Sequence, residues 1–342
     1  MKTIFSEKHR LRNPKTELHG GELVEPFERP SRAEYVVKRI REVNLGPVLD
    51  PNDHGMESLY KIHDKNYLDF LQLAWKLWQA EKFAGEAIPT TWPARRMHQR
   101  VPEFIEGKLG YYAMAAETSI SEGTWEAAYW SAQVAMTGAA EVQAGEAGVF
   151  ALCRPPGHHS ALDMYGGYCF LNNAAIAAQS FLDNGASRVA IVDVDFHHGN
   201  GTQDIFYKRN DVLFASLHGD PMDAFPHFLG YSDERGEGEG VGFNVNYPMK
   251  PGTGFEKWRS ALTDALDKVK DFSPDALVIS LGVDTFENDP ISFFKLTSQD
   301  FVSYGIDIAK LQLPTLFVME GGYDIEEIGV NTVNVLQGFS GD

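Results

Sequence analysis

Short, continuous apolar runs recur through the second half of the chain, and amphipathic segments separate them. Runs of this kind are typical of parallel strands that are covered on both faces. The segments between them carry helical patterns, such as residues 173–184, which stop at Gly185, and residues 255–271. We therefore predict an α/β fold in which helices sandwich a parallel sheet. The predicted strands are residues 148–153, 189–192, 212–217, 276–280 and 315–319.

Reactive side chains follow these runs at their carboxyl ends. The His158–His159 pair follows the first run, Asp195 and His197 follow the second, and Asp284 follows the fourth. Tyr323 comes after two glycines that follow the last run. A single His–His pair more often serves hydrogen bonding at a core edge, but a second pair, His197–His198, also follows a strand, and two such pairs favour chemistry. Because open α/β sheets bind ligands at the carboxyl ends of their strands, the shared placement predicts one site.

The D-x-D-x-H pattern at residues 193–197 indicates a metal site. Alternate residues of an extended strand share a face, so Asp195 and His197 can reach one ion, with Asp284 as a third ligand. This set leaves coordination positions open, as a catalytic site requires. Zn²⁺ is the default ion, although Fe²⁺ or Mn²⁺ would also suit two carboxylates and one imidazole. Since imidazoles transfer protons near neutral pH, the His158–His159 pair beside a metal indicates metal-assisted hydrolysis.

Composition limits the class of protein. The chain has 342 residues, 43% of them hydrophobic, which is enough for one large core, and we expect a single domain over residues 1–342. No apolar run approaches the roughly 20 residues of a membrane span. The first residues read as a short strand and show no signal-peptide core. Because the two cysteines, Cys153 and Cys169, are too few for a disulfide framework, we expect a cytoplasmic protein without membrane contact.

The charge balance is strongly acidic. With 30 basic and 48 acidic residues, the formal net charge is −18. This disfavours nucleic acid as a partner, because such binding depends on cationic contacts to phosphate. A cationic substrate is compatible with the charge, although acidity also serves solubility alone.

Residues 75–106 differ from the alternating pattern around them. They combine Trp75, Trp78, Phe83 and Trp92 with a basic run at residues 95–100, and Pro89 and Pro93 interrupt any helix. As an inserted segment it could contact a second copy of the chain and narrow the entrance to the active site. The alternative is an ordinary surface loop packed on its own aromatic side chains.

Several motifs occur in the order seen in the histone-deacetylase branch of the arginase/deacetylase superfamily, which the chain resembles from residue 1 to about 339. The resemblance implies that superfamily's single-domain fold. Two further segments, residues 15–23 and 290–297, look like bacterial acetylpolyamine amidohydrolases in particular. The superfamily motifs are R-P-P-G-H-H (154–159), G-G-Y-C-F-L-N-N (166–173), V-D-V-D-F-H-H-G-N-G-T (192–202), S-L-H (216–218), S-L-G-V-D (280–284) and E-G-G-Y (320–323).

The resemblance implies catalytic roles for individual residues. His159 matches the general base, and His158 matches the adjacent histidine that stabilises the transition state or acts as the acid. Asp193 would orient His158, and the Tyr323 hydroxyl would polarise the acetyl carbonyl. Asn200 stands where many histone deacetylases have an aspartate partner for His159, and a neutral amide leaves that imidazole less basic. The metal ligands implied by the resemblance are Asp195, His197 and Asp284.

The resemblance also implies a substrate channel. Gly167 would accept the substrate amide N–H through its carbonyl, while Tyr168 and Phe225 would wall the channel around the alkyl chain. Carboxylates near the mouth should bind distal ammonium groups, and the candidates are Glu117 and Glu106 on a helix-like segment at residues 106–120. Either glutamate could instead be an ordinary exposed helix charge.

Two structural potassium sites are implied as well. The first would use Asp193, Asp195, His197, Ser216 and Leu217, and the second would use backbone of Phe206, Arg209, Val212 and Phe243.

The expected reaction is hydrolysis of the acetyl amide of an acetylated polyamine to acetate and the free amine, by a homodimer. One alternative is a protein acetyl-lysine deacetylase, which needs an open rim rather than an enclosed acidic mouth. Another is a catalytically inactive acyl-ligand sensor on the same fold. The sensor is disfavoured because every metal ligand, both histidines and Tyr323 are present.

Overall fold

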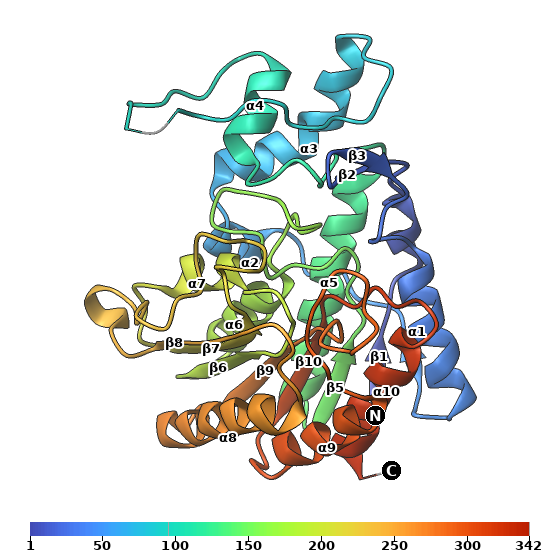
Figure 1. The fold of residues 1–342 in the computed structure, drawn as a ribbon, viewed down its shortest axis with the longest axis vertical. Helices are drawn as coiled ribbons and strands as arrows, with labels where there is room; N and C mark the ends of the chain where they lie inside the picture. Colours follow the sequence, from blue (N-terminus) through green and yellow to red (C-terminus); the bar gives the residue numbers. More distant parts are fainter. Residues whose placement is uncertain (95, 342) are drawn as a thin grey trace.

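A parallel sheet of eight strands forms the centre of the molecule (Figure 1). The computed structural model describes residues 1–94 and 96–341, so Arg95 of the basic run and Asp342 lie outside the described residues. Every neighbouring pair of strands is parallel. In spatial order the strands are β4 (Val48–Leu49), β1 (Lys2–Ile4), β5 (Gly148–Ala151), β10 (Thr315–Met319), β9 (Ala276–Leu281), β6 (Val189–Asp193), β7 (Val212–Gly219) and β8 (Asn244–Met249).

Successive residues of the central strands enter two separate cores, one on each face of the sheet. In β6, Val189 and Ile191 pack into one core, whereas Ala190 and Val192 pack into the other. Because both faces are covered, these strands are apolar throughout, and the predicted helix–sheet–helix layers are confirmed. The first core receives α2 (Glu57–Ile62), α3 (Lys65–Ala80), α4 (Ile105–Tyr112), α5 (Thr124–Gln143) and α6 (Asn173–Asp183), and the second receives α1 (Ser31–Glu42), α8 (Phe255–Phe272), α9 (Ser298–Ala309) and α10 (Ile328–Ser340).

The five predicted central strands and the first short strand all form, and the two predicted helices form as α6 and α8 within one residue of the expected ends. The apolar pattern missed β8, where polar and apolar residues alternate and Pro248 interrupts the strand. β8 pairs only with β7, and proline is tolerated on such an edge strand. The pattern also missed the antiparallel hairpin of β2 (Glu17–His19) and β3 (Glu22–Val24).

The loops that carry the predicted site meet at one edge of the sheet. Strands β5, β10, β9 and β6 are consecutive neighbours, and all point the same way. The reactive residues lie in the segments that follow the carboxyl ends of these four strands. Asp195 and His197, for example, lie between β6 and α7 (Asn200–Phe206). The topology therefore brings them together from distant parts of the sequence.

The segment around α3 and α4 stands away from the sheet (Figure 1). The prediction of a helix over residues 106–120 is wrong beyond Tyr112, where α4 ends. Ala113 instead forms a parallel bridge with Tyr165, and Ile120 forms an antiparallel bridge with Ala87. These tertiary hydrogen bonds override the helix propensity of the alanine-rich sequence. Among the residues that the structure describes, no helix is long and apolar enough to cross a membrane.

Candidate active site

Asp195, His197 and Asp284 converge at the carboxyl ends of β6 and β9. One ligand atom from each lies within 4.8 Å of the others, and all three side chains are buried. Glycines make room for this group. A Cβ atom at Gly282 would lie 2.0 Å from the Asp195 carboxylate, and one at Gly321 would lie 2.6 Å from both carboxylates. The glycines in S-L-G-V-D and E-G-G-Y therefore follow from close backbone approach to the two aspartates.

The electrostatics of this group call for a cation. Burial and the negative charge of Asp195 raise the pKa of Asp284 to about 6. Burial opposes a charged His197, but hydrogen bonds to the two carboxylates raise its pKa to about 9. Two carboxylates this close in a buried site are stable when a positive charge lies between them. The donor set of two carboxylates and one imidazole fits a divalent metal ion.

The histidine pair beside this group is held by two different partners. His158 Nδ1 lies 3.0 Å from Asp193 Oδ2, and His159 Nδ1 lies 2.7 Å from Asn200 Oδ1. Burial opposes charge on His158, but Asp195 and Asp193 raise its pKa to about 10. Burial and the neighbouring His158 lower the pKa of His159 well below its ordinary value. The carboxylates thus favour a proton on His158, whereas His159 is held neutral, and this difference favours the roles predicted from the sequence.

Tyr323 faces the same cavity from the end of β10. Its ring is buried and lies under the Arg32 guanidinium, 4.7 Å from the ring centroid. Its backbone N–H donates to Asp289 Oδ2 over 2.7 Å. Burial raises the pKa of its hydroxyl well above the ordinary value, so the hydroxyl stays protonated and can donate a hydrogen bond.

A cavity of about 330 Å³ opens onto these groups. Tyr168 and Phe225 both line it, and their rings lie 5.6 Å from that of Tyr323 and 5.1 Å from that of His159, respectively. Gly167 lies against the His159 ring, since a Cβ there would come within 2.3 Å of it, and its φ of +55° suits glycine. The structure thus brings the three predicted channel residues together at the reactive groups.

Acidic side chains also line the cavity. Glu117 is half-buried there, and its Oε1 accepts the Gly167 N–H over 2.7 Å. Glu17 is 2% exposed and accepts the Tyr168 hydroxyl over 2.7 Å. Asp223 is a third, exposed carboxylate of the cavity. Glu106 is exposed on α4 and does not line the cavity, so the structure brings only one of the two predicted glutamates to it.

Comparison with known proteins agrees with this geometry. Residues 26–339 match the histone deacetylase domain family. The chain belongs to that family. It is 58% identical to the acetylpolyamine amidohydrolase of Mycoplana ramosa over 100% of both chains, and 56% identical to acetylpolyamine amidohydrolase 1 of Pseudomonas aeruginosa over 100% of this chain and 99% of that one.

Solved structures of the family share the fold. The crystal structure of acetylpolyamine aminohydrolase from Burkholderia pseudomallei matches with a TM-score of 0.94 and 41% identity, covering 99% of this chain and 98% of that one. The HDA15 HD domain matches with a TM-score of 0.83 and 26% identity, covering 100% of this chain and 88% of that one. The resemblance inferred from the motifs and the expected fold are both confirmed.

Besides Glu17, the buried acidic residues Glu320 and Asp289 of this deacetylase fold were missed in the sequence. Glu320 Oε2 accepts the N–H groups of Gly157 and His158 over 2.6 and 3.1 Å, which ties the histidine turn to the end of β10. Asp289 holds Tyr323 in the same way from the loop after β9. Glu320 stands within the E-G-G-Y motif and Asp289 directly precedes residues 290–297, but neither motif shows a backbone contact.

The positions predicted to hold potassium lie where β6 and β7 pair and beyond α7. Asp193 is in register with Ser216, whose hydroxyl lies 2.8 Å from His218 Nδ1. Of the second set, the Phe206 carbonyl accepts the Arg209 N–H and the Phe243 carbonyl accepts the Phe214 N–H, each leaving one lone pair. Both sites remain predictions.

Proposed function

We propose that the chain hydrolyses the acetyl amide of acetylated polyamines, releasing acetate and the free amine. The observation that carries the proposal is the cavity, which His159 and Tyr323 line together with the carboxylates of Glu17, Glu117 and Asp223. An acetyl group would enter between the aromatic walls, and a distal ammonium group would then lie among carboxylates. Similar proteins named for this substrate class support the proposal.

The chain's own residues account for the proton transfers. His159 Nδ1 donates to Asn200, so its Nε2 keeps a lone pair that can take a proton from the attacking water. His158 carries a proton that can pass to the leaving amine, and Asp193 fixes its ring. The Tyr323 hydroxyl donates to the oxyanion that develops on the carbonyl.

We propose zinc as the ion that Asp195, His197 and Asp284 hold, and potassium as the ion at the two structural positions. The bound divalent metal would polarise the acetyl carbonyl and lower the pKa of the attacking water. Two carboxylates and one imidazole can also bind Fe²⁺ or Mn²⁺. Metal analysis of the purified protein therefore decides which metal it holds.

We further propose that the chain is a cytoplasmic homodimer that uses residues 75–106. Trp78 and Phe83 pack together with ring centroids 4.3 Å apart, yet Trp92, Met97 and Val101 are exposed, with Met97 71% exposed. An apolar surface of this kind is suited to a second copy. The two free cysteines suit a reducing compartment.

Charge at the mouth provides the test. We expect Glu17→Gln and Glu117→Gln to lower kcat/KM for an acetylated polyamine by about 10- to 100-fold each, the size of a lost hydrogen bond to a charged group. Glutamine keeps the oxygen that accepts from Tyr168 or Gly167. Turnover of a neutral N-acetylated alkylamine of equal length is the control and should change little. An equal loss for both substrates would instead show that the glutamates support the cavity wall.

A further inference from the structure

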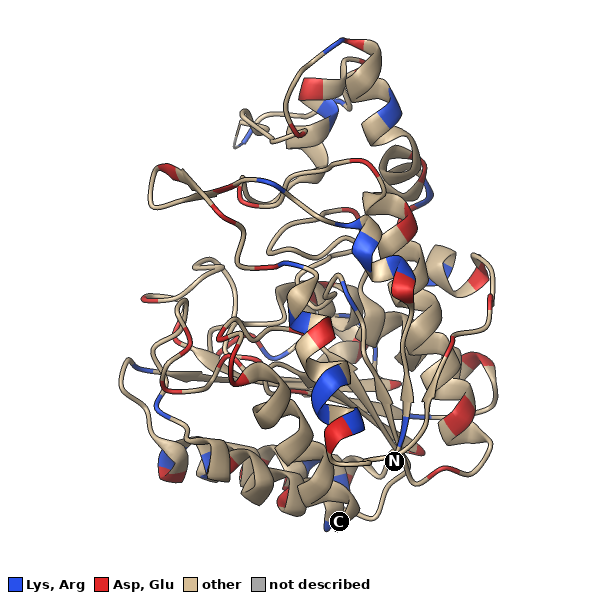
Figure 2. Ribbon diagram, turned by 90° about the vertical axis from the view of Figure 1, so that its right-hand side faces the viewer, with Lys and Arg blue, Asp and Glu red and all other residues tan. Residues whose placement is uncertain are grey.

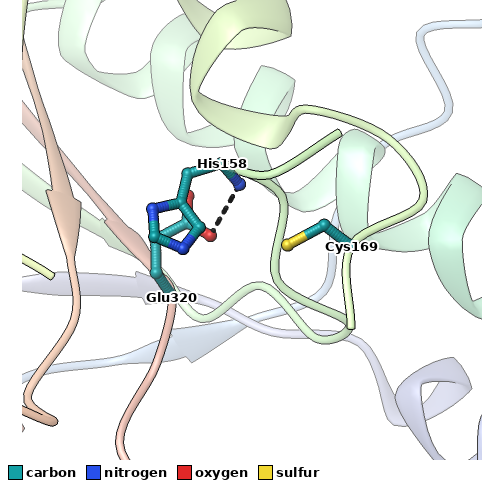
Figure 3. Close-up of side chains that lie close together, drawn as sticks. All are labelled: His158, Cys169 and Glu320. Atoms are coloured by element: carbon teal, nitrogen blue, oxygen red, sulfur yellow. Dashed lines mark hydrogen bonds between the residues drawn. The ribbon is translucent and has the colours of Figure 1, made fainter. Parts of the chain in front are cut away.

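A second group of possible metal ligands lies behind the histidine pair. A ring nitrogen of His158, the Cys169 sulfur and a Glu320 carboxylate oxygen all lie within 4.8 Å of one another, and all three residues are buried. Figure 3 shows the Cys169 sulfur pointing toward His158 and Glu320. The three come from the turn after β5, from the G-G-Y-C-F motif and from the end of β10. None of them belongs to the Asp195, His197 and Asp284 set.

The Glu320 carboxylate provides independent evidence for a ligand. Its Oε2 is bonded to two backbone N–H groups, but its Oε1 has no hydrogen-bond partner among the described residues and the side chain is 0% exposed. A buried carboxylate oxygen without a partner costs free energy comparable to several lost hydrogen bonds. A cation at this position would remove the cost.

We propose that His158, Cys169 and Glu320 form a second site, for a thiophilic divalent cation such as Zn²⁺ or Cd²⁺. Ligand atoms around one tetrahedral zinc ion lie roughly 3.4–3.8 Å apart, so small side-chain movements would close the observed geometry. A thiolate, an imidazole and a carboxylate are a donor set that favours soft cations over Mg²⁺ or Ca²⁺. Asp193 adds negative charge beside the group, because its carboxylate lies 3.0 Å from His158 Nδ1.

Loading this site releases protons. The Cys169 thiol, which now donates to the Gly167 carbonyl over 3.2 Å, loses its proton to become a thiolate ligand. His158 gives up the proton on the ring nitrogen that binds the ion. An ion held by His158 would also prevent that ring from carrying a proton to the leaving amine, so the second ion would inhibit; this consequence rests on the proposed function, whereas the binding does not.

The test is a Cd²⁺ titration of enzyme whose first metal site is already filled, followed by ultraviolet absorption, bound-metal analysis and acetate release. Cd²⁺–thiolate charge-transfer absorption reports this site alone, because Asp195, His197 and Asp284 supply no sulfur. Cys153→Ala is the matched control, since Cys153 is also free and buried but its sulfur donates to the Ser131 carbonyl instead. Cys169→Ser keeps the size of the side chain and a donor for Gly167.

We expect a second equivalent of Cd²⁺ and the thiolate absorption in wild type and Cys153→Ala, and the loss of both in Cys169→Ser. The inhibiting Cd²⁺ concentration should rise by at least about tenfold in Cys169→Ser. No thiolate absorption in wild type, or its persistence in Cys169→Ser, would overturn the site. If Cys169→Ser does not fold, the wild-type and Cys153→Ala titrations still decide. Binding without inhibition would leave the site standing and contradict the role given to His158.

Discussion

The carboxyl edge of the sheet and the segment at residues 75–106 differ in how far their side chains are buried and held by partners. At the sheet edge both histidines of the pair are buried and each has a fixed partner, Asp193 for His158 and Asn200 for His159. In the segment, Met97 and Val101 are exposed to solvent. The comparison shows that the reacting groups are positioned within one chain, whereas the segment leaves apolar side chains exposed to solvent.

The two regions are also held in place by different contacts. The site is anchored by backbone hydrogen bonds to buried carboxylates, which tolerate little change because removing one leaves unpaired groups in the core. The segment is anchored to the hairpin region by Glu86, which accepts N–H groups of Lys15 and Thr16. Substitutions in the site should therefore affect chemistry first, and substitutions at the segment's surface should affect association first.

The largest expected effect follows removal of a metal ligand. Asp195→Asn or Asp284→Asn should abolish metal binding and acetate release, because each removes one of two carboxylates from a three-ligand set. Metal analysis, an activity assay and circular dichroism check this together. A folded variant with a full equivalent of metal and near-normal turnover would contradict the assignment.

Loss of the Tyr323 hydroxyl should come next. Tyr323→Phe should lower kcat by about 10²–10³-fold, the usual loss for one oxyanion donor, with a much smaller change in KM. Steady-state kinetics on an acetylated polyamine measure both constants. A loss that appears only in KM would make Tyr323 a substrate-binding residue.

The partner of His159 sets the acid side of the pH profile. In the wild type the lowered pKa keeps His159 unprotonated as the pH falls through neutrality, so activity should persist below pH 6.5, the ordinary pKa of histidine. Asn200→Asp places a negatively charged carboxylate beside His159 Nδ1 and raises that pKa. The acid limb of the kcat/KM profile should then move to higher pH by about one unit. At a pH below this limb, kcat/KM should therefore fall by about tenfold. An unmoved limb would show that another group controls it.

The smallest effect on the stability of the single chain is expected for a substitution on the surface of residues 75–106. Met97→Glu should convert a dimer to a monomer while changing unfolding free energy by no more than about 0.5 kcal/mol, as is usual for surface positions. Light scattering after size exclusion measures the mass. Val241→Glu is the control, because Val241 is 62% exposed in a different loop. A monomeric wild type, or a dimeric Met97→Glu, would leave residues 75–106 as an ordinary surface segment.

The sequence predicted the centre of the molecule better than its periphery, for a physical reason. Apolar runs define buried strands, and parallel strands bring their carboxyl ends together, so Asp195, Asp284 and Tyr323 could be placed in advance. Glu17 was missed because its burial depends on the pairing of β2 with β3 and on Tyr168, neither of which leaves a periodic signal. The helix predicted beyond Tyr112 failed because bridges to distant residues replaced its hydrogen bonds.

The most direct test of the account compares kcat/KM for an acetylated polyamine with kcat/KM for an acetyl-lysine protein, using metal-loaded wild-type enzyme. The acidic mouth formed by Glu17 and Glu117 predicts a preference for the polyamine of at least about 10- to 100-fold, the contribution of one hydrogen bond to a charged group. Equal or higher kcat/KM for the acetyl-lysine protein would contradict the account and favour a protein deacetylase.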